Sequence, residues 1–117
     1  IVQYQYSKKG NKIVKISREW KENNGNYIDT YTDFFLLKNE EKIYANQSIV
    51  FKNRSDEEDM GGWSCTFWIH KNKVIHMTSL GHGKTETDDW DYEKELKENF
   101  NYMIEKVRKM DKNNKKK

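Results

Sequence analysis

The sequence predicts an α+β fold, in which an antiparallel meander of about six strands forms a curved sheet or half-barrel packed by one long C-terminal helix. Two observations lead to this prediction. Apolar and polar residues alternate over most of the first 80 residues, which is the period of half-buried strands. From about residue 89 onward the apolar residues recur at steps of three and four, which is the period of an amphipathic helix.

The first three strands follow from alternation and from turn residues. Residues 2–6, in which Val and Tyr alternate with Gln, predict the first strand. Gly10 lies in a turn that leads to the second strand, over residues 13–20. Asn24-Gly25 is the strongest short hairpin signal in the chain and folds residues 27–37 back onto the second strand.

Three further strands are predicted over residues 42–52, 63–70 and 74–80, with a polar loop over residues 53–62 and a tight turn at Lys71-Asn72. The register of the last hairpin, around His70 and His76, stays open. We expect four aromatic residues to fill the core, namely Phe34, Phe51, Trp63 and Phe67.

The last third of the chain predicts a helix over residues 89–110. Its apolar stripe consists of Leu96, Phe100, Met103, Ile104, Val107 and Met110. Thr87, Asp88 and Asp89 are candidate N-caps. We therefore expect one α+β domain over residues 1–111, followed by a disordered Lys-rich tail over residues 112–117.

Composition excludes several classes of protein. The 117 residues contain no apolar run that could span a membrane, and the single cysteine excludes an intramolecular disulfide framework. The net charge is +3, but four lysines lie in the last six residues, so residues 1–111 carry a net charge of −1. A nucleic-acid-binding domain needs a basic patch on its folded face, and we expect no specific nucleic acid as a partner.

Three patterns that resemble functional motifs are better explained structurally. The segment Gly81–Thr85 lacks the first glycine of a phosphate-binding loop, which would fall at Thr78. The acids of residues 56–59 are consecutive, whereas calcium loops alternate acids with spacers, so a charged mobile loop is expected. Cys65 lies in the middle of an apolar strand face, which predicts a core thiol rather than a nucleophile.

The three histidines, His70, His76 and His82, lie on or near one hairpin and could approach one another. A zinc site would need a further protein ligand and a favourable register. We therefore expect no metal site, no cofactor and no catalytic residue.

Large aromatic residues on the outer face of the sheet are the remaining functional signal. Tyr27, Tyr31 and Trp68 are expected on the faces opposite to the core, with His70 beside Trp68. Exposed aromatic residues of this kind form binding surfaces. These four residues are the predicted binding site, for a protein or a small ligand.

Residue usage points to provenance. The chain has 19 Lys against 3 Arg, 12 Asn, one Ala and no Pro, which is typical of an AT-rich genome. It begins at Ile1, as a chain would after removal of a signal peptide or when cut from a longer protein. We expect a non-enzymatic binding domain of an exported or lipid-anchored bacterial surface protein, which contacts a membrane only through an anchor outside this chain. The alternatives are a cytosolic or phage-encoded inhibitor or immunity-type protein and, third, a small enzyme or metal-binding domain.

Overall fold

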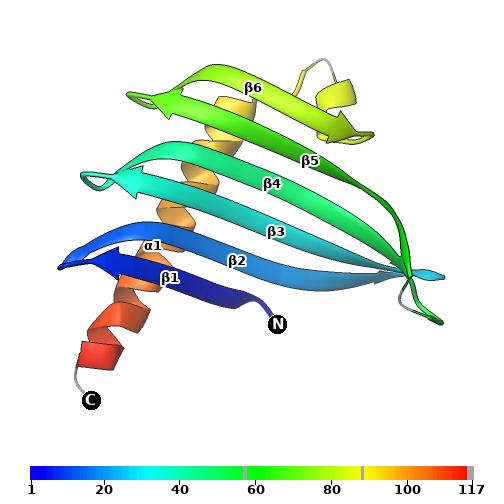
Figure 1. The fold of residues 1–117 in the computed structure, drawn as a ribbon, viewed down its shortest axis with the longest axis horizontal. Helices are drawn as coiled ribbons and strands as arrows, with labels where there is room; N and C mark the ends of the chain where they lie inside the picture. The colour runs from blue at the N-terminus through cyan, green and yellow to red at the C-terminus, as the bar shows by residue number, and fades with distance from the viewer. Residues whose placement is uncertain (57, 88, 116–117) are drawn as a thin grey trace.

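The computed structural model describes residues 1–56, 58–87 and 89–115, which form one open antiparallel sheet and one long helix. The sheet has the order β1-β2-β3-β4-β5-β6 (Figure 1). The strands are β1 (Gln3–Lys9), β2 (Lys12–Asn24), β3 (Tyr27–Lys38), β4 (Glu41–Asn53), β5 (Asp59–His70) and β6 (Lys73–Gly81). A short 3-10 helix, η1 (Lys84–Glu86), leads to α1 (Tyr92–Lys115). The predicted meander packed by a C-terminal helix is confirmed.

Two-residue turns connect β3 to β4 and β5 to β6. Both residues of the β3–β4 turn, Asn39 and Glu40, have positive φ, and so do Lys71 and Asn72 of the β5–β6 turn. Positive φ at both central positions is the mark of the hairpin turn whose twist matches that of the strands. A one-residue register shift follows in each of these hairpins, and such bulges bend a sheet.

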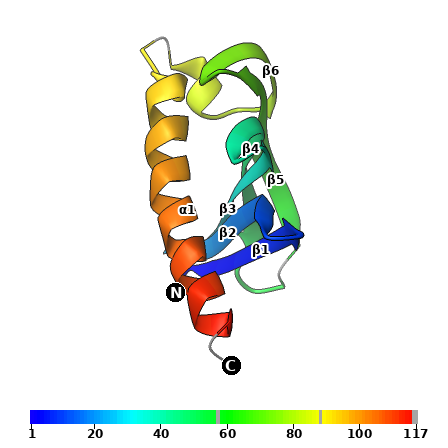
Figure 2. The same cartoon turned by 90° about the vertical axis from the view of Figure 1, so that its left-hand side faces the viewer.

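Helix α1 covers one face of the sheet and crosses its strands, so the domain has two layers (Figure 2). The predicted stripe of the helix is buried from Leu96 to Val107, whereas Met110 is only partly buried. Phe100 meets Phe35 of β3 edge to face, with ring centroids 5.3 Å apart. This packing fixes which sheet face is the core.

The third strand shows the opposite face assignment from the one expected. Phe35 is 1% exposed and faces the helix, whereas Phe34 lies on the outer face and contacts Tyr44 edge to face. The cause is the pairing of Ile16 with Phe35 in β2–β3. Because residues 34–37 are all apolar, the sequence pattern alone does not show which of them face the helix.

Helix α1 begins and ends later than predicted. Its first turn is capped by Asp91, whose Oδ1 accepts a hydrogen bond from the backbone N–H of Lys94 at 3.2 Å. Of the expected caps, Asp88 lies outside the described residues. At the other end the helix continues to Lys115, which corrects the expected disorder over residues 112–115; residues 116–117 lie outside the described part.

Contacts with β1 hold this last part of the helix. Lys8 forms an ion pair of 3.0 Å with Asp111, and the side-chain amide of Asn114 donates to the Tyr6 hydroxyl at 2.9 Å. One turn beyond the apolar stripe is therefore tied to the edge strand by polar groups.

The loop between β4 and β5 is shorter than expected, because β5 begins at Asp59 rather than at residue 63. Of the acidic cluster, Asp59 is therefore part of a strand, Asp56 accepts a hydrogen bond from the backbone N–H of Glu58, and Glu57 lies outside the described residues.

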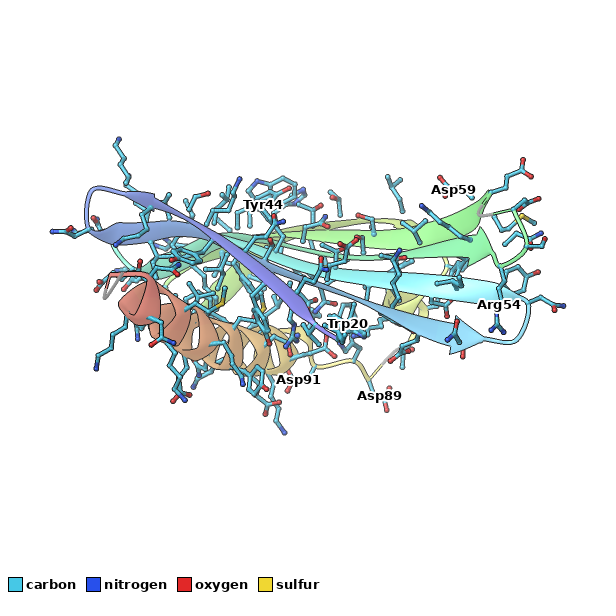
Figure 3. The ribbon with its side chains drawn as sticks, turned by 90° about the horizontal axis from the view of Figure 1, so that it is seen from below. Trp20, Tyr44, Arg54, Asp59, Asp89 and Asp91 are labelled. Carbon is cyan, nitrogen blue, oxygen red and sulfur yellow. The ribbon has the colours of Figure 1, made fainter. Side chains whose placement is uncertain are left out.

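The strands are longer than the width covered by the helix. The ends of β2 to β5 near the β2–β3 turn extend past α1 (Figure 3). In the same view Tyr44 points away from the helix, and Trp20 lies on the helix side. No helix among the described residues is long and apolar enough to cross a membrane.

Candidate functional site

A row of three polar residues crosses the helix-facing side of the sheet. Arg18 of β2 pairs with Asp33 of β3, which in turn pairs with Gln47 of β4. Apolar or aromatic rows lie on both sides of it: one is Ile16, Phe35 and Ala45, and the other is Trp20, Tyr31 and Ile49. Because side chains alternate between the two faces, these three polar groups point into the space between sheet and helix.

Arg18 and Asp33 form an ion pair across the two strands. The Nε of Arg18 donates to Oδ2 of Asp33 at 2.8 Å, and the side chains are 15% and 9% exposed. Burial raises the pKa of Asp33, and the hydrogen bond and charge of Arg18 offset this only in part. The guanidinium also lies over the Trp20 ring, 5.2 Å from its centroid. Arg18 is thus held by an acid and by an aromatic face.

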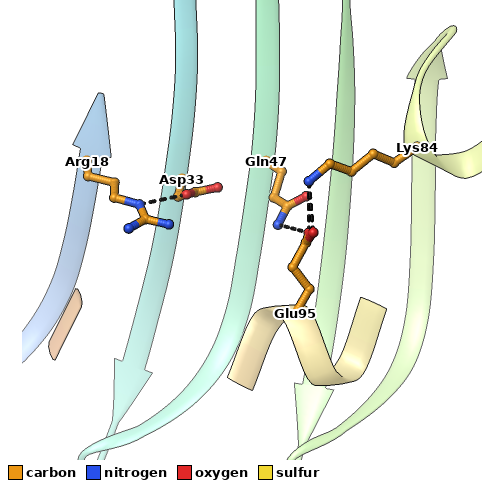
Figure 4. A network of polar contacts seen from close by, with 5 residues as sticks. All are labelled: Arg18, Asp33, Gln47, Lys84 and Glu95. Atoms are coloured by element: carbon orange, nitrogen blue, oxygen red, sulfur yellow. Dashed lines mark hydrogen bonds and ion pairs between the residues drawn. The ribbon is translucent and has the colours of Figure 1, made fainter. Parts of the chain in front are cut away.

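Gln47 joins the sheet to the helix (Figure 4). Its Nε2 donates to Oε2 of Glu95 at 2.9 Å, and Lys84 of η1 donates to both oxygens of Glu95 at 3.0 Å. A carboxylate only accepts hydrogen bonds, so the amide nitrogen of Gln47 must face Glu95. Its Oε1 then has no hydrogen-bond partner among the described residues, although Gln47 is only 5% exposed.

These residues line a cavity of about 220 Å³ between the sheet, η1 and the first half of α1. The polar network supplies one part of its wall, and Asn99 of the helix contributes beside Glu95. The apolar part consists of Trp20, Tyr31, Ile49 and Trp63. Concave sites with apolar walls and a few convergent polar groups are the usual form of ligand-binding sites.

The segment that carries Lys84 is seated on Trp63. A Cβ on Gly83 would lie 2.5 Å from the Trp63 ring, and one on Gly81 would lie 2.2 Å from the backbone oxygen of Gly62. Trp63 Nε1 also donates to Oγ1 of Thr85 at 3.1 Å. The glycines therefore allow a close crossover between β6 and α1, and Lys84 is engaged by Glu95 rather than presented to a phosphate.

The structure separates the four predicted binding residues. Tyr31 faces the helix side and lines the cavity, where its ring stacks on Trp20 with centroids 5.1 Å apart and an interplanar angle of 6°. Its predicted place on the opposite face was wrong, because the faces of β3 are inverted relative to the prediction. Tyr27, 44% exposed, lies at the start of β3, far along the sheet from the polar row. Trp68 and His70 lie on the outer face of β5.

Trp68 belongs to a second aromatic group, on the outer face. Its ring meets Tyr44 edge to face at 5.8 Å and lies 5.1 Å from His76, and Phe34 meets Tyr44 from the other side. Trp68 is 37% exposed. His70 lies near it at the end of β5 and is exposed.

The other residues considered as catalytic groups or metal ligands have structural roles. Cys65 is fully buried and burial raises its pKa to about 11, which confirms a core thiol. His76 contacts Trp68, whereas His82 is paired with Glu86 on the crossover. Within the described residues no three His, Cys, Asp or Glu side chains are grouped so that they could hold a metal ion.

The cavity residues Arg18, Asp33, Gln47, Lys84 and Glu95 were missed by sequence reasoning. A weak signal was present, because each residue of the polar row stands two positions from an apolar core residue of its strand. Three adjacent strands that each place a polar residue at an inward position indicate a built polar site. Recognising this pattern requires the strand registers.

No protein-family model matches this sequence, and no curated protein or solved structure is significantly similar to it.

Proposed function

We propose that this chain is a non-enzymatic binding domain that takes a small molecule into the cavity between its sheet and its helix. One observation carries the proposal. The buried Oε1 of Gln47 has no hydrogen-bond partner in the described part of the chain, and Gln47 lines a cavity whose wall includes Trp20, Tyr31 and Trp63. A buried acceptor without a partner is destabilising, so a bound donor explains its retention.

The charges of the site favour binding over catalysis. Arg18 is paired with Asp33, and Lys84 with Glu95, so each charged group already has an opposite partner. A general acid, base or nucleophile must be free to exchange a proton or attack. The one thiol of the chain is buried in the core and has a raised pKa.

Binding is tested by protein-observed NMR with a library of uncharged and charged one-ring fragments. We expect several fragments to shift the signals of Trp20, Gln47 and Glu95 at submillimolar to millimolar concentration. Hits that shift only the outer face around Trp68, or the absence of any saturable hit, would contradict the proposal.

A matched pair of variants locates the binding. Asn99→Trp places a large side chain at the cavity wall, whereas Glu98→Trp places it on the exposed side of the same helix. The first should abolish fragment binding and the second should leave it unchanged, while both retain the circular dichroism of the parent. Equal binding by the two variants would show that the fragments bind elsewhere.

A second candidate function is protein contact through the outer face. The observation that favours it is the aromatic group formed by Phe34, Tyr44 and Trp68, beside His70. Exposed Trp is enriched at the energetic centres of interfaces. Trp68→Ala should then weaken capture of a partner without changing fragment binding in the cavity, whereas unchanged capture would exclude this face.

We further propose that the domain acts outside the cell, as part of an exported or lipid-anchored protein. The residue usage is typical of an AT-rich genome, and a chain with one cysteine fits bacterial surface proteins that fold without disulfides. The reading frame upstream of Ile1 tests this: a hydrophobic signal with a lipid-attachment cysteine supports it, and a start codon directly before Ile1 contradicts it.

A further inference from the structure

We propose that the cavity selects a neutral molecule built on one planar ring that carries an N–H or O–H donor. This inference rests on the proposed binding function and adds the chemical class of the ligand. Three properties of the cavity carry it: its charge balance, the unpartnered and buried Oε1 of Gln47, and its aromatic wall.

Charge balance argues for a neutral ligand. Among the described residues that line the cavity, two are cations, Arg18 and Lys84, and two are anions, Asp33 and Glu95. Each cation is bonded to one anion, at 2.8 Å and 3.0 Å respectively. A charged ligand would have to compete with one of these pairs or lie without a partner of its own, and an unpaired charge is unfavourable beside the largely buried Arg18–Asp33 pair.

The unpartnered atom specifies the polar group of the ligand. Gln47 Oε1 is an acceptor with no partner among the described residues, and the bond from Gln47 Nε2 to Glu95 fixes its orientation. An acceptor requires a donor. A ligand without an N–H or O–H would leave this oxygen unpaired, so it should bind more weakly than a ligand that donates to it.

The aromatic wall and the volume specify the body of the ligand. The Trp20 and Tyr31 rings are nearly parallel, and Trp63 adds a third aromatic side chain. Aromatic side chains favour offset-stacked or edge-to-face contact with another ring. The cavity of about 220 Å³ is larger than an apolar cavity of about 150 Å³ that accepts benzene. One ring with a small polar substituent therefore fits.

Three probes of nearly equal shape test the charge selection. Benzamide is neutral and carries N–H donors, benzoate is anionic and benzamidine is cationic at pH 7. Titration followed by NMR should give the lowest dissociation constant for benzamide, by about tenfold or more over both charged probes. Tighter binding of benzoate or benzamidine in the cavity would overturn the class of ligand and leave the proposed binding function standing.

The donor requirement is tested on the probe and on the protein. N,N-dimethylbenzamide is neutral but has no N–H, and it should bind about tenfold more weakly than benzamide. Gln47→Met removes the acceptor and should weaken benzamide to a similar extent. Asn46→Leu is the matched control, because Asn46 is the neighbouring residue on the outer face, bonded to Thr66, and it should leave the affinity unchanged.

The outcomes separate this inference from the function on which it rests. Equal affinity of benzamide and its dimethyl form, or of the parent and Gln47→Met, would overturn the role of Gln47. If benzamide fails to bind while other fragments occupy the cavity, the class is wrong and the function stands. If no fragment binds at all, both are wrong, and the cavity holds water only.

Discussion

The two neighbouring phenylalanines of β3 provide a direct test of the fold, because they lie on opposite faces of the sheet. Phe35 is 1% exposed and packs against Phe100 of the helix, whereas Phe34 lies on the outer face and is only partly buried. Removal of a buried Phe side chain costs about 3–5 kcal/mol. For the partly buried ring of Phe34, we expect about 1–2 kcal/mol from the area it buries.

The measurement is urea denaturation of Phe35→Ala and Phe34→Ala, followed by circular dichroism, with thermal melts in parallel. In a domain of this size each kcal/mol lowers Tm by about 3–6 °C, so Phe35→Ala should melt about 9–30 °C below the parent. Phe34→Ala should melt less than about 12 °C below it. A larger loss for Phe34→Ala than for Phe35→Ala would mean that β3 is inverted. The polar row would then face solvent, and the proposed cavity would not exist.

Three further predictions concern other parts of the molecule. Cys65 should react slowly with a thiol reagent in native buffer at pH 8 and rapidly in denaturant, because the thiol is buried and its pKa is about 11. Burial raises the pKa of Asp33 above 3.8, so the folded state binds the proton more tightly than the unfolded state. The stability of the parent relative to Asp33→Asn should therefore fall as pH rises from about 4, as measured by urea denaturation at several pH values. A chain ending at Asp111 should lose retention on heparin, because the lysines that follow give the chain its positive charge. Its stability should fall by no more than about 1 kcal/mol, because Asn114 is the residue bonded to β1 among the described residues after Asp111.

Each of these has an opposite result that would contradict it. Equal labelling rates of Cys65 in both conditions would show an exposed strand face. A relative stability of the parent that rises with pH would show that the charge of Arg18, and not burial, dominates at Asp33. Heparin retention that survives truncation would reveal a basic face on the folded body, and would make nucleic acid a partner to be tested.

The sequence predicted the strands and the helix well because each element carries its own local signal. Alternation marks the strands, and Asn24-Gly25 marks the hairpin between β2 and β3. The steps of three and four from Leu96 to Val107 mark the buried side of the helix, which packs as expected. Signals of this kind lie within about ten residues of chain and need no knowledge of distant neighbours.

Face assignment and the site were not predictable by the same means. The four apolar residues 34–37 fit either parity, and only their pairing with Ile16 and the packing on Phe100 decide between the two. The site depends on registers in two successive hairpins and on a crossover that brings Lys84 to Glu95. Each of these relations joins residues that are far apart in the sequence.

Buried polar residues in the cavity need a reason other than stability. A buried ion pair such as that of Arg18 and Asp33 gains little over well-packed apolar side chains, because desolvation offsets the attraction between the charges. The rows on both sides are apolar or aromatic, so an apolar row between them would continue the core. A fold optimised only for stability would have apolar residues at the positions of Arg18, Asp33 and Gln47.

Helix α1 also carries apolar residues that pack on the sheet and polar residues that line the cavity. Leu96, Phe100 and Val107 bury one stripe against the sheet, while Glu95 and Asn99, one position earlier in successive turns, line the cavity. Because residues four apart lie on one side of a helix, these two polar residues face the part of the sheet that extends past the helix. Both the sheet and the helix therefore contribute polar residues to the wall of the cavity. Polar groups that converge on one space from β2, β3, β4, η1 and α1 are expected where a ligand is bound.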